Sequence, residues 1–111
     1  MAKARFVQTG DSIDYTPVSP VEAGDVVVQN DLVGVAKLDI AAGALGALAV
    51  AGVFEFPKDT GSASAIEAGK KVYWDEDAEV ATETSGGNDY LGKSILAAGD
   101  DDATVRVRLD Q

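Results

Sequence analysis

The sequence predicts a small, mainly β protein with a single domain, built as a barrel or a sandwich-like pair of sheets with at most one short helical turn. Short runs rich in Val, Ile, Leu and aromatic residues recur between Gly, Pro, Asp and Asn at intervals of roughly 8 to 15 residues. The chain has 111 residues, which suits one hydrophobic core. A barrel and a sandwich give the same pattern of short strands, so that choice stays open.

Several of these runs alternate with the two-residue period of a half-buried strand. Val105, Val107 and Leu109 would share one face of a strand, while Arg106 and Arg108 would point to the other. The segments expected to form strands are residues 4–8, 13–15, 25–29, 32–39, 46–56, 71–74, 80–84, 90–97 and 104–109.

Two local features connect these strands. Asn30 and Asp31 lie between two apolar runs and tolerate left-handed backbone angles, so residues 25–39 are expected to form a hairpin. Residues 64–69 could form one helical turn that ends at Gly69. Residues 82–89 are rich in Thr, Ser, Gly and Asn and fit a flexible loop.

The net charge of −10 argues against a nucleic acid as the main partner, because phosphates would be repelled. Along the sequence, Lys and Arg are not concentrated into a stripe that could overcome this charge. A strongly acidic surface is either simply solvated or suited to a basic patch on a partner.

The chain contains neither Cys nor His. Thiol chemistry, disulfides and zinc–thiolate sites are therefore excluded. The absence of His removes the commonest acid–base group at neutral pH and the commonest metal ligand. We therefore expect a protein that is not an enzyme, with no catalytic residues and no cofactor.

The sequence predicts neither a signal peptide nor a membrane span. Only Phe6 and Val7 follow the two N-terminal cations before polar residues begin. The Ala-rich residues 40–54 are too short for a span and contain Gly43, Gly46 and Gly52. We expect a soluble protein in the cell that makes it, a single domain over residues 1–111, and residues 1–7 that could form an N-terminal arm.

One motif satisfies the phosphate-loop pattern of Gly, four residues, then Gly-Lys-Ser, in residues 87–94. A phosphate loop must open a substantial helix within a parallel sheet. The residues after Ser94 contain Gly99, three consecutive Asp and a strand pattern, and Asp89 would repel a nucleotide. We favour a polar loop that enters a strand, in which Gly92 permits a bend or bulge.

Two acidic clusters, residues 75–77 and 100–102, carry the oxygen ligands that calcium or magnesium would need. Neither has the spacing of a calcium-binding loop, so solvated turns are expected and no metal site is predicted. Trp74 beside Tyr73 could stack against a sugar in a carbohydrate-binding module, but we favour a core position for Trp74.

An ordered set of short phrases extends from about residue 3 to residue 109. These phrases are Ile13-Asp14-Tyr15-Thr16-Pro17, Ala23-Gly24-Asp25-Val26-Val27-Val28, Val33-Gly34-Val35-Ala36, Ile40-Ala41-Ala42-Gly43, Ala49-Val50-Ala51-Gly52-Val53-Phe54, Pro57-Lys58, Gly69-Lys70-Lys71-Val72-Tyr73-Trp74-Asp75, Leu91-Gly92 and Val105-Arg106-Val107-Arg108-Leu109. Together they resemble the capsid cement, or head decoration, proteins of tailed bacteriophages.

The resemblance implies a small β domain that attaches to the outside of an expanded phage head, commonly as a trimer, and reinforces it. The implied partners are the major capsid protein and further copies of the chain, with neither nucleic acid nor membrane. The protein would lie on the capsid surface of the virion and in the host cytoplasm during assembly. Residues expected to contact the capsid or other copies are Lys3, Arg5, Phe6, Tyr15 and Pro17.

Three functions are therefore weighed: capsid cement, a generic β-rich virion module that binds carbohydrate or protein, and a nucleotide-binding protein related to recombination. The last rests only on residues 87–94.

Overall fold

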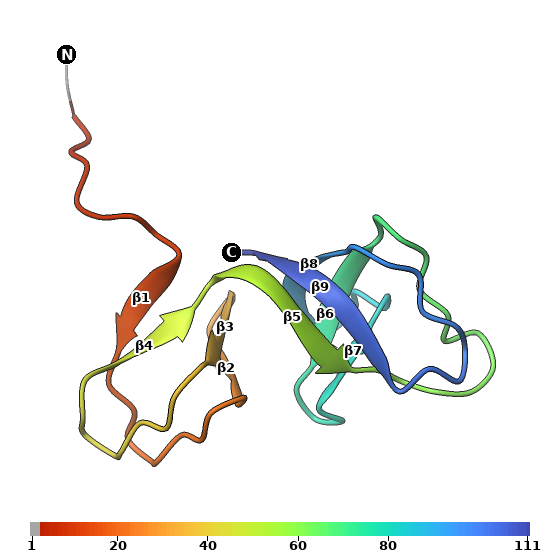
Figure 1. The fold of residues 1–111 in the computed structure, drawn as a ribbon, viewed down its shortest axis with the longest axis horizontal. Coiled ribbons are helices and arrows are strands. Elements are labelled where there is room, and N and C mark those ends of the chain that lie inside the picture. Colours follow the sequence, from red (N-terminus) through yellow and green to blue (C-terminus); the bar gives the residue numbers. More distant parts are fainter. Residues whose placement is uncertain (1–2) are drawn as a thin grey trace.

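The computed structural model describes residues 3–111 and contains nine strands in two antiparallel sheets over that range (Figure 1). The four-stranded sheet has the order β1 (Ser12–Tyr15), β4 (Gly46–Ala49), β3 (Leu32–Ala36), β2 (Val26–Gln29). The five-stranded sheet has the order β5 (Ala51–Pro57), β9 (Thr104–Asp110), β8 (Asp89–Ser94), β6 (Lys71–Asp75), β7 (Val80–Thr82). The mainly β fold class is confirmed, in its sandwich-like form.

The alternation predicted for the last strand is present in β9. Val105, Val107 and Leu109 are buried, and Arg106 and Arg108 are exposed. Apolar side chains at every second position cover one face of a sheet, which here is the face directed at the core.

The hairpin predicted for residues 25–39 is formed by β2 and β3. Gln29 pairs with Leu32, so Asn30 and Asp31 make a two-residue turn. Asn30 has a φ of 56°, the left-handed conformation that Asn tolerates better than most residues.

The single strand expected over residues 46–56 is wrong, because the chain changes sheets inside it. Ala49 pairs with β1 and β3, whereas Ala51 pairs with Asp110 of β9. Val50 lies between the two strands, where it is buried and donates its backbone N–H to the carbonyl of Asp11 at 2.9 Å. The run is apolar on both sides of Val50, so its composition does not mark the change.

The strand expected over residues 4–8 is also absent: these residues are exposed and pair with no other strand. Residues 1 and 2, at the start of the expected arm, lie outside the described residues. The helical turn considered for residues 64–69 does not form, because Ile66 is buried and bridges to Ala98 in an extended conformation. Strands β3, β7 and β8 end two or three residues earlier than expected.

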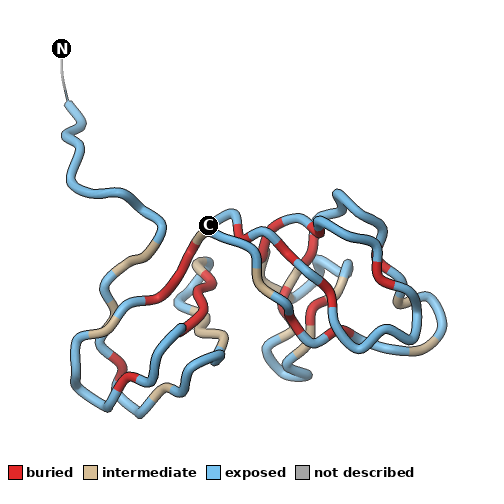
Figure 2. Tube along the Cα trace, in the orientation of Figure 1, coloured by how far each residue is buried: buried red, intermediate tan, exposed pale blue. Residues whose placement is uncertain are grey.

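The core lies between the inner face of the five-stranded sheet and the β2–β3 hairpin. Figure 2 shows the buried segments along these strands and at the β4–β5 junction. Phe56 and Trp74 contact each other with ring centroids 5.9 Å apart, and Val33 and Val35 of β3 belong to the same buried cluster. The two sheets therefore share one core.

Gln111 ties the two sheets together with its side-chain amide. Its Oε1 accepts a hydrogen bond from the Val33 N–H at 2.8 Å, and its Nε2 donates to the carbonyls of Tyr90 and Leu91, each at 2.8 Å. Those carbonyls lie where β8 has a bulge, since Val72 pairs with Gly92 but Tyr73 pairs with Tyr90. The amide thus satisfies acceptors that the irregular ladder leaves free.

Within residues 3–111, the structure has no helix that is both long enough and apolar enough to cross a membrane.

Candidate functional site

The N-terminal segment, residues 3–11, projects away from both sheets (Figure 1). Three of the predicted contact residues, Lys3, Arg5 and Phe6, lie on it and are exposed. Phe6 is 81% exposed and Val7 is 72% exposed, although burial of such side chains is favourable by about 1.5–3 kcal/mol each. The segment thus presents two cations together with apolar side chains.

The other two predicted contact residues, Tyr15 and Pro17, lie at the end of β1. Tyr15 is half-buried and pairs with Gly46, whereas Pro17 is buried and its carbonyl accepts a hydrogen bond from the Gly43 N–H at 2.8 Å. Gly43 adopts a φ of 75°, which glycine accommodates without strain. Strand β1 forms one edge of its sheet, and an edge strand offers unpaired N–H and C=O groups to a partner strand. The contact role of the five residues stays a prediction.

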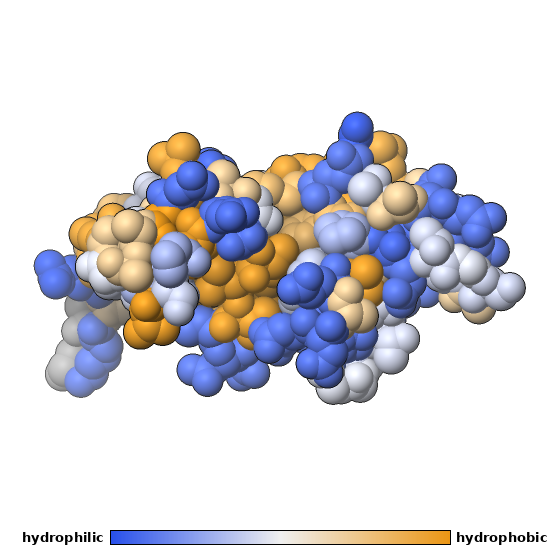
Figure 3. Space-filling view, turned by 90° about the horizontal axis from the view of Figure 1, so that it is seen from below, coloured by the Kyte–Doolittle hydropathy of each residue, from blue (hydrophilic) through white to orange (hydrophobic). Residues whose placement is uncertain are grey.

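An apolar hollow of about 450 Å³ lies on the four-stranded sheet beside β1, and the sequence did not point to it. Its walls include two strongly exposed leucines, Leu38 at 77% and Leu45 at 72%. Gly46 is part of the wall, and a larger residue would clash there, because a Cβ would lie 2.5 Å from the Ile40 side chain. Figure 3 shows apolar side chains on the surface of the part of the molecule that holds the four-stranded sheet. Exposed apolar surface of this kind is typical of protein contacts.

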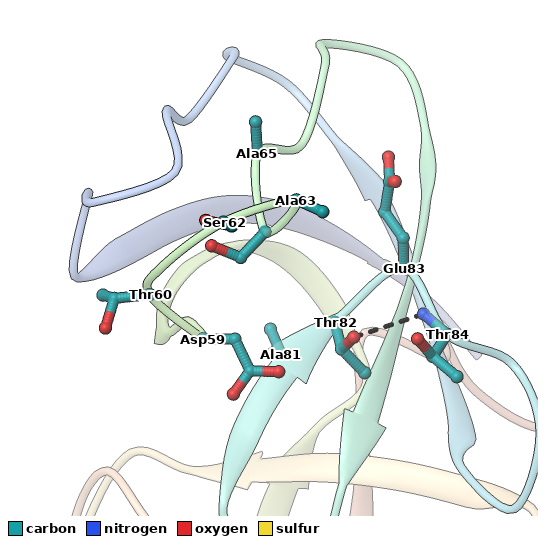
Figure 4. A pocket seen from close by; sticks show the side chains of 10 residues that line it. Asp59, Thr60, Ser62, Ala63, Ala65, Ala81, Thr82, Glu83 and Thr84 are labelled. Atoms are coloured by element: carbon teal, nitrogen blue, oxygen red, sulfur yellow. Dashed lines mark hydrogen bonds between the residues drawn. The ribbon is translucent and has the colours of Figure 1, made fainter.

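A second hollow, of about 330 Å³, has polar walls and lies between residues 59–65 and β7 (Figure 4). Its two carboxylates, Asp59 and Glu83, come from these separate segments. Thr84 donates its N–H to the Thr82 hydroxyl at 3.2 Å, so part of the polar lining is used within the chain. None of residues 87–94 lines this hollow.

The nucleotide-binding interpretation of residues 87–94 is wrong. Asp89–Ser94 form β8 in the middle of an antiparallel sheet, so the Gly-Lys-Ser residues lie within a strand and open no helix. Gly92 has a packing role: a Cβ at this position would lie 1.9 Å from the Arg108 carbonyl oxygen. The bulge expected near Gly92 is present at Leu91.

The acidic clusters organise turns. Oδ1 of Asp75 accepts the N–H groups of Asp77 and Ala78, each at 3.1 Å, and Oδ2 of Asp102 accepts the Gly99 N–H at 2.7 Å. Among residues 3–111, no three Asp or Glu side chains gather as a metal site. Trp74 is only 5% exposed and belongs to the core, as favoured above, so it offers no platform for a sugar.

The outer face of the five-stranded sheet carries cations that are distant in the sequence. Lys71 pairs with Lys93, and Lys93 pairs with Arg108, so these three form a row across β6, β8 and β9. We call Lys71, Lys93 and Arg108 the cationic row; all three are exposed. Like charges directly opposite in a sheet destabilise it by up to about 1 kcal/mol per pair. The three residues are far apart in the sequence, and only the register of the strands brings them together.

Beside the cationic row, the Tyr73 and Tyr90 rings contact each other with centroids 5.7 Å apart. The Tyr90 hydroxyl donates to Oδ2 of Asp110 at 3.3 Å. Partial burial, followed by the negative charge of Asp110, raises the pKa of Tyr90 above its ordinary value. Tyr90 is therefore a neutral hydrogen-bond donor at physiological pH.

Comparison with known proteins identifies the family of the chain. The family of phage cement proteins matches residues 7–109. The chain therefore belongs to the phage cement protein family, a family of structural proteins associated with phage capsids. Comparisons with curated proteins and with solved structures gave no match.

Proposed function

We propose that this chain is a non-enzymatic cement protein that binds the outer surface of the mature phage head as a homotrimer and stabilises it. The family match over residues 7–109 is the observation that carries the proposal. The partner is the major capsid protein, and residues 1–111 act as one β domain with an N-terminal arm. The protein is in the host cytoplasm during assembly and on the virion surface afterwards, and it needs neither cofactor, nucleic acid nor membrane.

A cement protein stabilises a shell because it binds the expanded lattice and not the separated subunits. Many equivalent sites multiply a modest contact at each one. The structure suits this task, because it has two sheets around one core and exposed apolar groups at its periphery.

The N-terminal segment and β1 are the proposed attachment region. Lys3, Arg5 and Phe6 combine charge with an exposed aromatic side chain, and the free edge of β1, near Tyr15 and Pro17, can accept a strand. Among residues 3–111, residues 3–10 pair with no strand, so pairing with a capsid strand would satisfy their backbone groups.

Binding to purified shells tests the proposal. Expanded shells that lack the protein are expected to bind it saturably, at a fixed ratio to the major capsid protein, while unexpanded shells bind little. Light scattering after size-exclusion chromatography reports whether trimers form before docking. Failure to bind expanded shells would contradict the proposed function, whatever the oligomeric state.

The attachment region can be tested with one substitution. Phe6→Ser removes an exposed aromatic from the segment and is expected to weaken shell binding by about 10- to 100-fold, because burial of a Phe side chain provides about 1.5–3 kcal/mol. Leu96→Ser is the control, since Leu96 is also an exposed apolar residue, 53% exposed, but follows β8 of the other sheet and lies outside the attachment region. Equal binding by the two variants would rule out this role of Phe6.

A further inference from the structure

A third hollow has the chemistry to receive a cationic side chain. Its volume is about 350 Å³, and it lies between the β2–β3 hairpin and the β6–β7 turn. Acidic side chains and an apolar floor line it together: Asp25, Glu76 and Glu79 with Val26, Val27, Pro57 and Trp74. We call this the acidic hollow. Figure 3 views the molecule from below and shows apolar side chains of the four-stranded-sheet part meeting a group of polar ones.

The acidic hollow matches the two parts of a Lys or Arg side chain. The aliphatic stem of such a side chain packs on apolar surface, and its charged end stays at a polar rim. Glu76 and Glu79 are exposed on the turn after β6, so their carboxylates are accessible at that rim. Asp25 is also exposed, although its Oδ2 already accepts the Glu22 N–H at 2.9 Å.

The cationic row has the complementary chemistry. Neighbouring strands lie about 4.8 Å apart, so Lys71, Lys93 and Arg108 place three charges within about 10 Å. Arg106, two residues from Arg108 on the same face, adds a fourth. Three strand carboxylates share this face, and each accepts a hydrogen bond within the chain. Glu55 accepts one from the Thr104 hydroxyl and Asp110 accepts one from Tyr90. Asp75, at the end of β6, accepts the N–H groups of Asp77 and Ala78. Glu83 lines a shallow hollow with Lys71 at the β6 end of the face.

We infer that the cationic row of one copy docks in the acidic hollow of the next copy. The occupant is a second copy because the chain itself offers both halves of the contact, the cationic row and the acidic hollow. The two surfaces differ, so the contact is head-to-tail, and a trimer joined by it would be a closed ring. This inference rests on the proposed function for the number of copies, three, and adds the surfaces that join them.

Cysteine cross-linking tests the contact without changing its charges, because the natural chain has no Cys. Val53→Cys places a thiol opposite Arg108, and Ala78→Cys places one between Asp77 and Glu79. Oxidation of the variant with both changes, in solution and on expanded shells, is expected to give covalent dimers and trimers on a denaturing gel. Each variant with a single cysteine should run as an uncross-linked monomer on that gel, since identical surfaces of two copies do not meet.

Two results of this experiment would overturn the inference. One is a double-cysteine variant that forms no covalent cross-link on oxidation, either in solution or on shells. The other is efficient cross-linking of a single variant, which would show that identical surfaces face each other. Wild-type binding to expanded shells is measured in parallel, so a missing contact between copies is distinguishable from failure of the proposed function.

Charge reversal supplies an independent test. Reversal of the row by Lys93→Glu with Arg108→Glu, or of the hollow by Glu76→Lys with Glu79→Lys, is expected to weaken trimer formation about 100-fold. A chain with all four changes should recover most of it, because the pairs are complementary again. No recovery would contradict the inference. Shell binding by the two double variants gives a further check. If reversal of the row abolishes shell binding and reversal of the hollow does not, the row binds an acidic surface of the capsid and the inference is overturned.

Discussion

Lys58 shows how a single buried cation organises two loops. It is only 4% exposed, and its Nζ donates to the backbone carbonyls of Asp59, Ser64 and Asp100. The Asp100 carbonyl also accepts the Ser64 hydroxyl at 2.8 Å. A buried ammonium with several carbonyl acceptors replaces the hydration that it loses.

We predict that Lys58→Met destabilises the protein by about 2–3 kcal/mol, because the Asp59 and Ser64 carbonyls lose their buried donor. Urea unfolding followed by tryptophan fluorescence measures the change. Lys37→Met is the control, since Lys37 is exposed and should change stability by less than about 0.5 kcal/mol. Equal stabilities of the two variants would contradict this role of Lys58.

Gly92 illustrates a residue whose side chain is excluded by a neighbouring backbone. Gly92→Ala is expected to destabilise by about 3 kcal/mol or more, because the new methyl group would overlap the Arg108 carbonyl and force β8 and β9 apart. Gly86→Ala is the matched control, because a Cβ there meets nothing within 4 Å. Thermal unfolding of both variants checks the prediction, and a normal Gly92→Ala midpoint would refute it.

At the scale of elements, sequence patterns predicted those strands that have one buried, apolar face and one exposed, polar face. The alternation in β9 and the Asn-Asp turn of the β2–β3 hairpin are local signals, and both structures formed as expected. The sheet change at Val50 was missed because Ala and Gly surround it, so the local sequence does not identify which sheet each strand joins. Residues 4–8 have a strand-like composition but no partner strand.

Candidate sites were harder to predict than strands, because they depend on which strands become neighbours in the sheets. Arg106 and Arg108 were expected to face outward, but only the register brings Lys71 and Lys93 beside Arg108. The acidic and apolar hollows combine residues from segments far apart in the chain. Hydrophobic periodicity carries no information on such long-range neighbours.

The link that Gln111 makes between β3 and the β8 bulge can be tested. We expect Gln111→Ala to destabilise by about 1–3 kcal/mol, because three hydrogen bonds are lost. Gln111→Glu should be at least as harmful, since it places an acceptor against the Tyr90 and Leu91 carbonyls. Gln29→Ala, at the exposed end of β2, is the control for denaturant unfolding. A neutral effect of both Gln111 variants would contradict the link.

For the whole molecule, the radius of gyration of 15.1 Å exceeds the value of about 13 Å expected for a compact chain of this length. The two sheets lie beside each other along the β4–β5 connection, and the N-terminal segment extends beyond them (Figure 1). This shape leaves both the apolar hollow near β1 and the cationic row available to different partners. One surface can thus face the shell while another joins neighbouring copies.

Genome release on heating tests the central claim, that the protein stabilises the mature head, most directly. DNA-filled heads without the protein are titrated with it, and the release temperature is followed with a DNA-binding dye while occupancy is measured on the same sample. If the proposed function is right, the release temperature rises with occupancy and levels off when the sites are full, because a protein that binds only the intact lattice stabilises it. An unchanged release temperature at full occupancy would contradict it.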